Sequence, residues 1–327
     1  MGEWSRIRFE SHMADQMKSS DISYNFSVAK VLSILMVATG HYFGGLLWIP
    51  TTIALFVFAF SSGYFSSLKY TGNFSVKQFW LAKVSRLGFS LLFINLFLLL
   101  LFLFQGKSNI FSWDSIIGMA GLSSILNWLN IPYKSPFGNG LWFLTVLYVF
   151  YLVYPLVERI NRNQRRAFLF VSFMLVVTAL LNSNVRVPYE LWMTVFAFLF
   201  GSYVTTISIK FSFYLVSIIL VVCVITMLVL NELFGINALN YYLILLVSIS
   251  VCGVLITHRL PNFFAQFTSL FSECVFEIYL IHTYLFLRFH DAEVLGYVGS
   301  ILLILLVAKL LSMTRKMMVL SMKYRLI

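Results

Sequence analysis

The feature of the sequence that most constrains its fold is a series of long apolar runs separated by short polar segments. An α-helix rises about 1.5 Å per residue, so about 20 apolar residues are needed to cross the hydrocarbon core of a membrane. The sequence therefore predicts an all-α integral membrane protein with about ten transmembrane helices. We expect them near residues 24–47, 49–67, 87–104, 141–157, 167–183, 189–208, 212–231, 240–257, 264–287 and 295–313.

Composition excludes several other classes of protein. Hydrophobic residues make up 60% of the 327-residue chain and charged residues only 11%, whereas a typical soluble domain is about 25% charged. Such a chain cannot form a water-facing surface, so it is not a soluble globular protein, a disordered chain or a nucleic-acid-binding module. The three cysteines lie inside apolar runs, so we expect neither a disulfide framework nor a Cys-rich metal site, and no metal.

The distribution of basic residues predicts the topology. With both ends of the chain in the cytoplasm, 17 basic residues fall in cytoplasmic segments, and four fall outside, namely Lys107, Lys134, Arg186 and Arg288. A weaker apolar run at 111–130 does not fit as a further span, because the arginine-rich loop that begins after residue 158 would then move outside. We therefore interpret 105–140 as an external, partly helical segment.

The chain is expected to form one membrane domain with short polar ends. The first 21 residues are polar and no small-residue cleavage site follows a short apolar region, so the first span should be retained. This division predicts a cytoplasmic N-terminal segment at 1–21, a single transmembrane domain at 22–313 and a basic cytoplasmic tail at 314–327.

Two ionisable residues lie within the first span, where each is costly to insert. Lys30 and His41 are eleven residues apart, which is about 20° beyond three full helical turns, so they share one face about 16 Å apart. A lysine near the cytoplasmic end and a deep imidazole suggest a channel-lining stripe, with His41 as the candidate general base. Alternatively, Lys30 is an interfacial anchor and His41 a packed, hydrogen-bonded histidine.

Three further regions carry polar or aromatic candidates. Ser62, Gly63 and Tyr64 end the second span at the depth of Lys30, although small residues also mediate helix contacts. Trp142 stands at the outer interface, where an aromatic belt would also explain it. The ninth span carries a dense polar set that favours a proton relay or substrate contact over structural hydrogen bonding. These residues are Glu273, Glu277, Tyr279 and His282.

In this order, these residues resemble the membrane-bound acyltransferase-3 proteins, which transfer acyl groups onto cell-surface glycans and related acceptors. The resemblance rests on a basic residue followed after ten residues by histidine, on SSGYF, on the basic residues that begin the third span, on LWFL and on IYLIH. In this sequence they are Lys30 and His41, Ser61 to Phe65, Lys83 and Arg86, Leu141 to Leu144, and Ile278 to His282. The sequence departs from the family at 275–277, where members often have Ser-Tyr-Ser. We expect a stand-alone form without the hydrolase-like domain that many members carry.

The resemblance implies transfer of an acyl group, expected to be acetyl, from cytoplasmic acyl-CoA to a hydroxyl of a cell-surface or lipid-linked polysaccharide. Lys30, Lys83 and Arg86 would bind CoA phosphates, and Ser62, Gly63 and Tyr64 belong to the same predicted donor site. His41 would act as general base or as acyl carrier. The expected location is a bacterial plasma membrane, with membrane lipids and glycan-assembly proteins as partners, no nucleic acid and no bound cofactor.

Two alternatives remain open at this stage. A secondary transporter or a flippase of lipid-linked glycan also has about ten helices with a few buried charges, although matching interruptions in two halves are not seen here. The other large class of membrane-bound O-acyltransferases has its intramembrane histidine late in the chain. In that case His282 would be essential and His41 dispensable.

Overall fold

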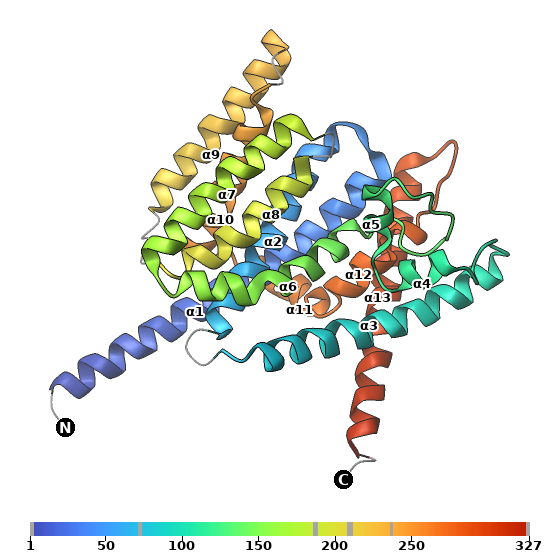
Figure 1. Ribbon diagram of the computed structural model, residues 1–327, viewed down its shortest axis with the longest axis horizontal. Helices are drawn as coiled ribbons and strands as arrows, with labels where there is room; N and C mark the ends of the chain where they lie inside the picture. The colour runs from blue at the N-terminus through green and yellow to red at the C-terminus, as the bar shows by residue number, and fades with distance from the viewer. Residues whose placement is uncertain (1–2, 71–73, 186–188, 208–211, 236–237, 325–327) are drawn as a thin grey trace.

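The computed structural model describes residues 3–70, 74–185, 189–207, 212–235 and 238–324 (Figure 1). Arg186, Lys210 and Arg325, which contribute to the charge count, lie outside these ranges. Helices joined by turns and loops make up the described ranges, and no β-strand occurs within them. The predicted all-α fold is confirmed.

Eight helices of the described residues are long and apolar enough to cross a membrane. They are α1 (Glu3–Phe43), α2 (Trp48–Tyr70), α3 (Val76–Phe104), α6 (Trp142–Asn161), α7 (Gln164–Asn184), α9 (Phe213–Leu228, extended by a π-helical turn at Val229–Leu233), α10 (Asn240–Thr257) and α13 (Glu293–Tyr324). The predicted span at 189–208 is the shorter helix α8 (Tyr189–Val204), which has 16 residues.

The predicted span at 264–287 is bent and is not one straight helix. It consists of α11 (Phe263–Phe271) and α12 (Val275–Ile281), and its two parts meet at an angle of 63°. Two carboxylates close to the bend pair with consecutive cations of α13: Glu273 with Lys316, and Glu277 with Arg315. The bend allows the first carboxylate to remain exposed while the second is buried.

The segment at 105–140 is partly helical, as predicted. It contains α4 (Trp113–Met119) and α5 (Ser123–Trp128), which are both far too short to span a membrane. Several hydrogen bonds attach it to neighbouring spans. Asn95 of α3 donates to the carbonyl of Met119 at 2.6 Å, and Thr145 of α6 donates to that of Gly121 at 2.7 Å.

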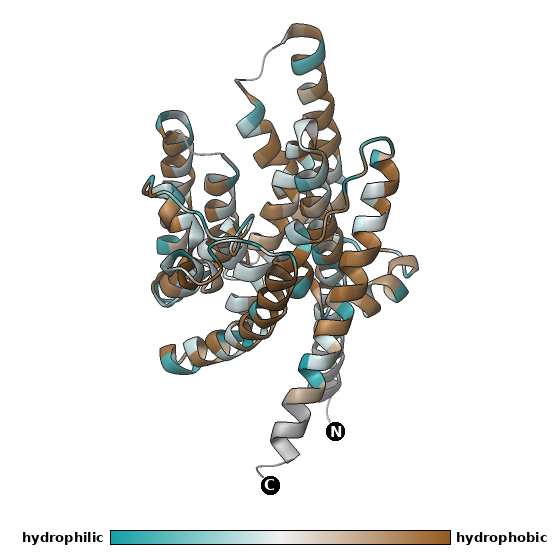
Figure 2. Cartoon of the chain, turned by 90° about the vertical axis from the view of Figure 1, so that its right-hand side faces the viewer, coloured by the Kyte–Doolittle hydropathy of each residue, from teal (hydrophilic) through white to brown (hydrophobic). Residues whose placement is uncertain are grey.

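Helices α2 and α8 pack closely at the centre of the bundle. A Cβ atom on Gly63 would lie 2.0 Å from the carbonyl oxygen of Phe198, and one on Gly201 would lie 2.2 Å from that of Phe60. Only glycine allows backbones to approach this closely, as at many helix contacts in membranes. Hydrophobic residues predominate along most of the helices (Figure 2), and many of them are exposed, such as Leu92 of α3, which is 70% exposed. This exposed surface suits contact with lipid.

The ends of the chain agree with the predicted topology. The first turns of α1 and the last turns of α13 project from the same side of the molecule (Figure 1). Both helices continue through the boundaries expected for the terminal segments, since α1 begins at Glu3 and α13 ends at Tyr324.

Candidate active site

A cavity of about 500 Å³, here called the inner cavity, lies between α1, α2, α3, α6, α12 and α13. The parts of α2, α3 and α13 that line it are those that the topology places toward the cytoplasm. Its lining is rich in cations, which are Lys30, Lys69, Lys83, Arg86 and Arg315 among the described residues. The inner cavity is therefore suited to bind an anionic molecule that arrives from the cytoplasm.

One face of α1 leads from this cavity to His41. Ser27, Lys30, Ile34 and Val37 line the cavity at helical spacing, and His41 follows one turn beyond the last of them. The predicted stripe thus lines the cavity as far as Val37, and His41 lies just beyond the described lining. The Lys30 ammonium lies over the ring of Phe65, 5.0 Å from its centroid, and faces the cavity. It therefore does not act as an anchor in the lipid interface.

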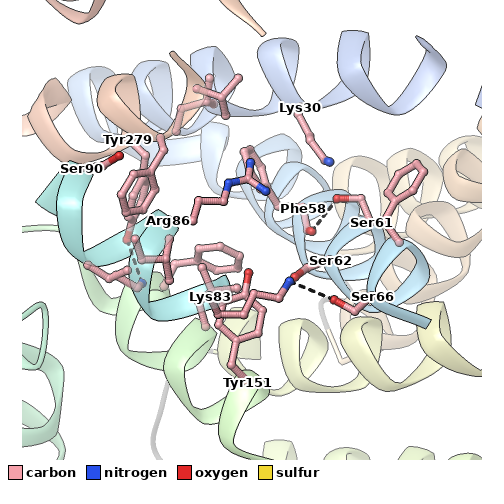
Figure 3. Close-up of a pocket in the computed structure, with 18 of the residues that line it drawn as sticks. Lys30, Phe58, Ser61, Ser62, Ser66, Lys83, Arg86, Ser90, Tyr151 and Tyr279 are labelled. Atoms are coloured by element: carbon pink, nitrogen blue, oxygen red, sulfur yellow. Dashed lines mark hydrogen bonds between the residues drawn. The ribbon is translucent and has the colours of Figure 1, made fainter. Parts of the chain in front are cut away.

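The side chains of Lys30, Lys83 and Arg86 extend into a common space, although they come from two different helices (Figure 3). The Lys83 ammonium donates a hydrogen bond to the hydroxyl of Ser66 at 3.2 Å and lies 4.3 Å from the ring centroid of Tyr151. These contacts fix the position of the Lys83 ammonium group, which is directed into the cavity. The structure thus brings the three predicted phosphate-binding residues together.

The SSGYF segment contributes unequally to the cavity. Ser62 lines it, whereas Gly63 and Tyr64 are absent from its described lining. Gly63 faces α8, and the Tyr64 ring stacks on Phe26 with a centroid distance of 5.9 Å. The serine is thus positioned to contact a ligand, and its two neighbours hold the helices together.

Two carboxylates line the same cavity near α13. The carboxylate of Glu277 is 2% exposed and pairs with Arg315, with 3.0 Å between Oε1 and Nε. Glu273 is exposed in the bend between α11 and α12 and accepts a hydrogen bond from Lys316. Arg315 is a cavity residue that the sequence analysis assigned only to the basic tail. The available signal was Glu277, because a carboxylate inside a membrane helix implies a cationic partner.

His41 lies beside a second histidine. The centroids of the His41 and His282 rings are 5.1 Å apart. His282 is fully buried, and its Nδ1 lies 2.6 Å from the carbonyl oxygen of Tyr279. Because a carbonyl can only accept, Nδ1 carries the proton of the neutral ring, and Nε2 presents a lone pair. This Nε2 has no hydrogen-bond partner among the described residues, whereas His41 is exposed.

A second cavity of about 380 Å³, here called the outer cavity, is formed by the external segment and the start of α6. Serine, asparagine and tyrosine side chains and Trp142 contribute to its lining. Burial raises the pKa of Tyr133, so its phenol stays protonated and donates to the carbonyl of Phe137. Ser123 likewise donates to the carbonyl of Gly138 at 2.9 Å.

Hydrogen bonds fasten the wall of the outer cavity to the segment that carries His282. Thr283 donates to the carbonyl of Asn139 at 3.0 Å, and the backbone N–H of Asn139 donates to the hydroxyl of Tyr284 at 2.9 Å. Tyr279 also lines the inner cavity and donates to the carbonyl of Gly140 at 3.4 Å. Of the four predicted polar residues of the ninth span, His282 thus contacts His41 directly, and Tyr279 contacts the loop at Gly140.

Gly140 brings the outer cavity next to His41. It has a φ of +72°, and a Cβ at this position would lie 3.8 Å from Cε1 of His41. His41 therefore stands between the inner cavity, which reaches Val37, and the outer cavity, which includes Gly140. Trp142 is the residue of this outer wall that was predicted as a site residue. The cluster of serine, asparagine and glycine before Trp142 was the available signal.

Comparison with known proteins identifies the family of this chain. The model of the acyltransferase-3 family, described as an acyltransferase domain, matches residues 23–313, which is nearly the whole chain. No curated protein and no solved structure matches the chain. Because the family match covers nearly the whole chain, the chain belongs to the acyltransferase-3 family and is a multi-pass membrane acyltransferase.

Proposed function

We propose that the protein transfers an acyl group, acetyl in the simplest case, from cytoplasmic acyl-CoA to a hydroxyl of a cell-surface or lipid-linked polysaccharide. The protein would act in a bacterial plasma membrane. The observation that carries this proposal is the row of α1 residues that leads from a cationic cavity to an exposed imidazole. A site for an anionic donor and a proton acceptor for the reacting hydroxyl are the two requirements of this reaction.

The inner cavity supports an acyl-CoA donor. CoA carries a phosphate and a pyrophosphate, and Lys30, Lys83 and Arg86 offer them charge-assisted hydrogen bonds. The arm that carries the thioester is long and narrow, and it would extend past Ile34 and Val37 toward His41. The distance of about 16 Å between the levels of Lys30 and His41 on the helix suits an arm of this length.

The chemistry at His41 has two balanced forms. As a general base, the imidazole removes the proton of the acceptor hydroxyl while its oxygen attacks the thioester carbon; the carbon–sulfur bond breaks, and the sulfur takes the proton. As an acyl carrier, the imidazole first displaces CoA and is then displaced by the acceptor oxygen. Both forms yield an ester and free CoA.

His282 is proposed to position His41. Its buried Nε2 lone pair requires a hydrogen-bond donor, and the adjacent His41 ring can supply an N–H. Donation from one nitrogen of His41 leaves the other nitrogen unprotonated and directed at the reactants. This role resembles the orientation of a catalytic histidine by a neighbouring acceptor in hydrolytic triads.

The direct test is to replace His41 by alanine in the native host and to measure ester-linked acyl groups on the purified surface polysaccharide. Replacement of the fully exposed His290 by alanine is the matched control, and immunoblots of the membrane fraction establish equal abundance. We expect the ester to disappear in His41→Ala and to remain in His290→Ala.

The same measurement in two further strains, one with His282→Ala and one that lacks the protein, distinguishes the alternatives. An ester that persists in His41→Ala but disappears in His282→Ala would favour the other class of membrane-bound O-acyltransferases. Equal ester content in a strain that lacks the whole protein would reject polysaccharide acylation in that host. A lipid-linked glycan that accumulates inside such a strain without loss of ester would favour a flippase.

A further inference from the structure

We propose that the outer cavity is the binding site of the acceptor and that it recognises an uncharged sugar ring. This inference rests on the proposed acyl transfer and names the residues and the chemical class that the reaction uses on its outer side. The donor site at the inner cavity and the position of His41 do not by themselves assign an acceptor site.

The position of the outer cavity is the first observation that supports this site. Its wall at Gly140 adjoins the His41 ring, and His41 lies one helical turn beyond Val37 of the inner cavity. A sugar hydroxyl at this wall could approach the imidazole from outside while a thioester approaches along α1. The two reactants would then meet at His41 without sharing a cavity.

The chemistry of the lining is the second observation. Within the described part of the chain, no charged side chain lines the outer cavity. The lining offers hydroxyls, side-chain amides and an indole, which suit a ring with many hydroxyls. These side chains belong to Ser123, Ser124, Asn127, Tyr133, Ser135, Asn139 and Trp142. An ionised sugar or a phosphate would find no opposite charge there, in contrast to the five cations of the inner cavity.

Trp142 provides a surface for one face of the ring. Its side chain is partly buried, so it is fixed and still accessible. The C–H face of a sugar packs on a flat aromatic ring, while the hydroxyls at the edge of the sugar reach polar side chains. Asn127 and Asn139 can supply these hydrogen bonds from the same lining. A volume of about 380 Å³ is at the lower end of the range of small-molecule sites, about 300 to 1,000 Å³.

The cavity is also held in shape by the protein itself. Tyr133 and Ser123 bond to backbone carbonyls of the loop, and Thr283 and Tyr284 bond to Asn139 from the segment that carries His282. A site that is preformed in this way loses little conformational entropy when a ligand binds. The fixed loop also keeps the acceptor at a constant distance from the imidazole.

The test uses the full-length protein in detergent, acyl-CoA, and surface polysaccharide from the native host after its esters have been removed with mild alkali. Transfer is measured as ester formed at increasing polysaccharide concentration, and CoA affinity is measured separately by calorimetry. Trp142→Ala should raise the KM for polysaccharide about tenfold or more, and Trp142→Phe should restore much of it. CoA affinity should remain that of the wild type in both variants.

Trp113→Ala is the matched control, because Trp113 belongs to the same external segment, is 82% exposed and does not line the cavity. A normal KM in Trp142→Ala would overturn the inference while the proposed function stands. Loss of CoA affinity in step with transfer would also overturn it, since the two sites would then not be separate. If the wild type forms no ester on the polysaccharide, the proposed function itself fails.

Salt tests the uncharged class of the acceptor. Added sodium chloride screens ionic contacts, so it should weaken CoA binding and leave the KM for polysaccharide unchanged. A KM for polysaccharide that rises with salt in the same way would show recognition of a charged acceptor and overturn this part of the inference.

Discussion

The inner and outer cavities both reach the neighbourhood of His41, yet their described linings differ in charge. Both contain hydroxyls and aromatic rings, but five cations and two carboxylates also line the described part of the inner cavity, whereas no charged side chain lines that of the outer one. Helices supply most of the inner lining, and a loop with two short helices supplies most of the outer lining. If the two cavities bind the proposed ligands, one side binds by charge and the other by shape and neutral hydrogen bonds.

The position of the charges also explains how they are tolerated in a membrane protein. The inner cations are near the cytoplasmic ends of their helices, where long basic side chains reach water at low cost. Carboxylates on α12 and in the preceding bend neutralise part of this charge through Arg315 and Lys316. A ligand with several phosphates can therefore add to an existing network of charges.

Replacement of His282, which contacts His41, should give the largest loss of transfer after replacement of His41 itself. His282→Phe removes the Nε2 acceptor at similar size, so kcat should fall about 100-fold, as expected when a catalytic group is misplaced. His282→Gln retains an acceptor and should recover part of that rate. Initial rates with saturating donor and acceptor measure both variants. Equal rates for the two would show that His282 acts through packing alone.

Removal of one cation from the inner cavity tests whether this cavity binds its ligand by charge. Arg86→Gln deletes charge-assisted hydrogen bonds worth about 1.5 to 3 kcal/mol, so the Kd for CoA should rise about 10- to 100-fold. Lys77→Gln makes the same change in charge at an exposed position of α3 outside the cavity lining. Calorimetry should show weaker CoA binding only in the first variant. Equal weakening in both would assign donor binding to the overall charge.

A methyl group on Gly140 tests the outer wall. Alanine at a φ of +72° costs about 1 to 2 kcal/mol, and its Cβ would lie 2.7 Å from Cγ2 of Thr283. Gly140→Ala should therefore reduce acyl transfer about tenfold and leave CoA affinity unchanged. Gly106→Ala also places alanine at positive φ, but no atom lies near its Cβ, so it should lower stability without a comparable loss of transfer. A similar loss in both variants would contradict a local role for Gly140.

The smallest effect is expected at the exposed rim of the inner cavity. Glu273 and Lys316 are 56% and 45% exposed, so this ion pair should contribute less than about 1 kcal/mol. Glu273→Gln removes this ion pair and should therefore lower the Tm only slightly, as measured by thermal unfolding at neutral pH. A large shift at neutral pH would indicate that the bend in the ninth span depends on this pair.

The sequence was sufficient for much of the membrane architecture. Apolar length located the helices, and the balance of basic residues placed 105–140 outside the membrane. Helical periodicity placed Lys30 and His41 on one face. These properties are local in sequence, because both the membrane thickness and the helical repeat are fixed lengths.

Other features depend on contacts between distant segments and could not be predicted. The pairing of Glu277 with Arg315 requires the bend between α11 and α12, which apolar length alone does not reveal. The separation of Gly63 from the donor cavity depends on which face of α2 meets α8. The outer cavity requires the loop at Asn139 to bond to Thr283, which lies 144 residues later.

The position of His41 beyond the end of the inner cavity would have a consequence for regulation under the proposed function. A donor that entered the inner cavity and reacted at its far end would release free CoA back through the same opening. Free CoA and acyl-CoA would then compete for the same cations, so the rate of transfer would depend on their ratio in the cytoplasm. Through this competition, the extent of modification outside the cell would report the acylation state of the CoA pool inside it.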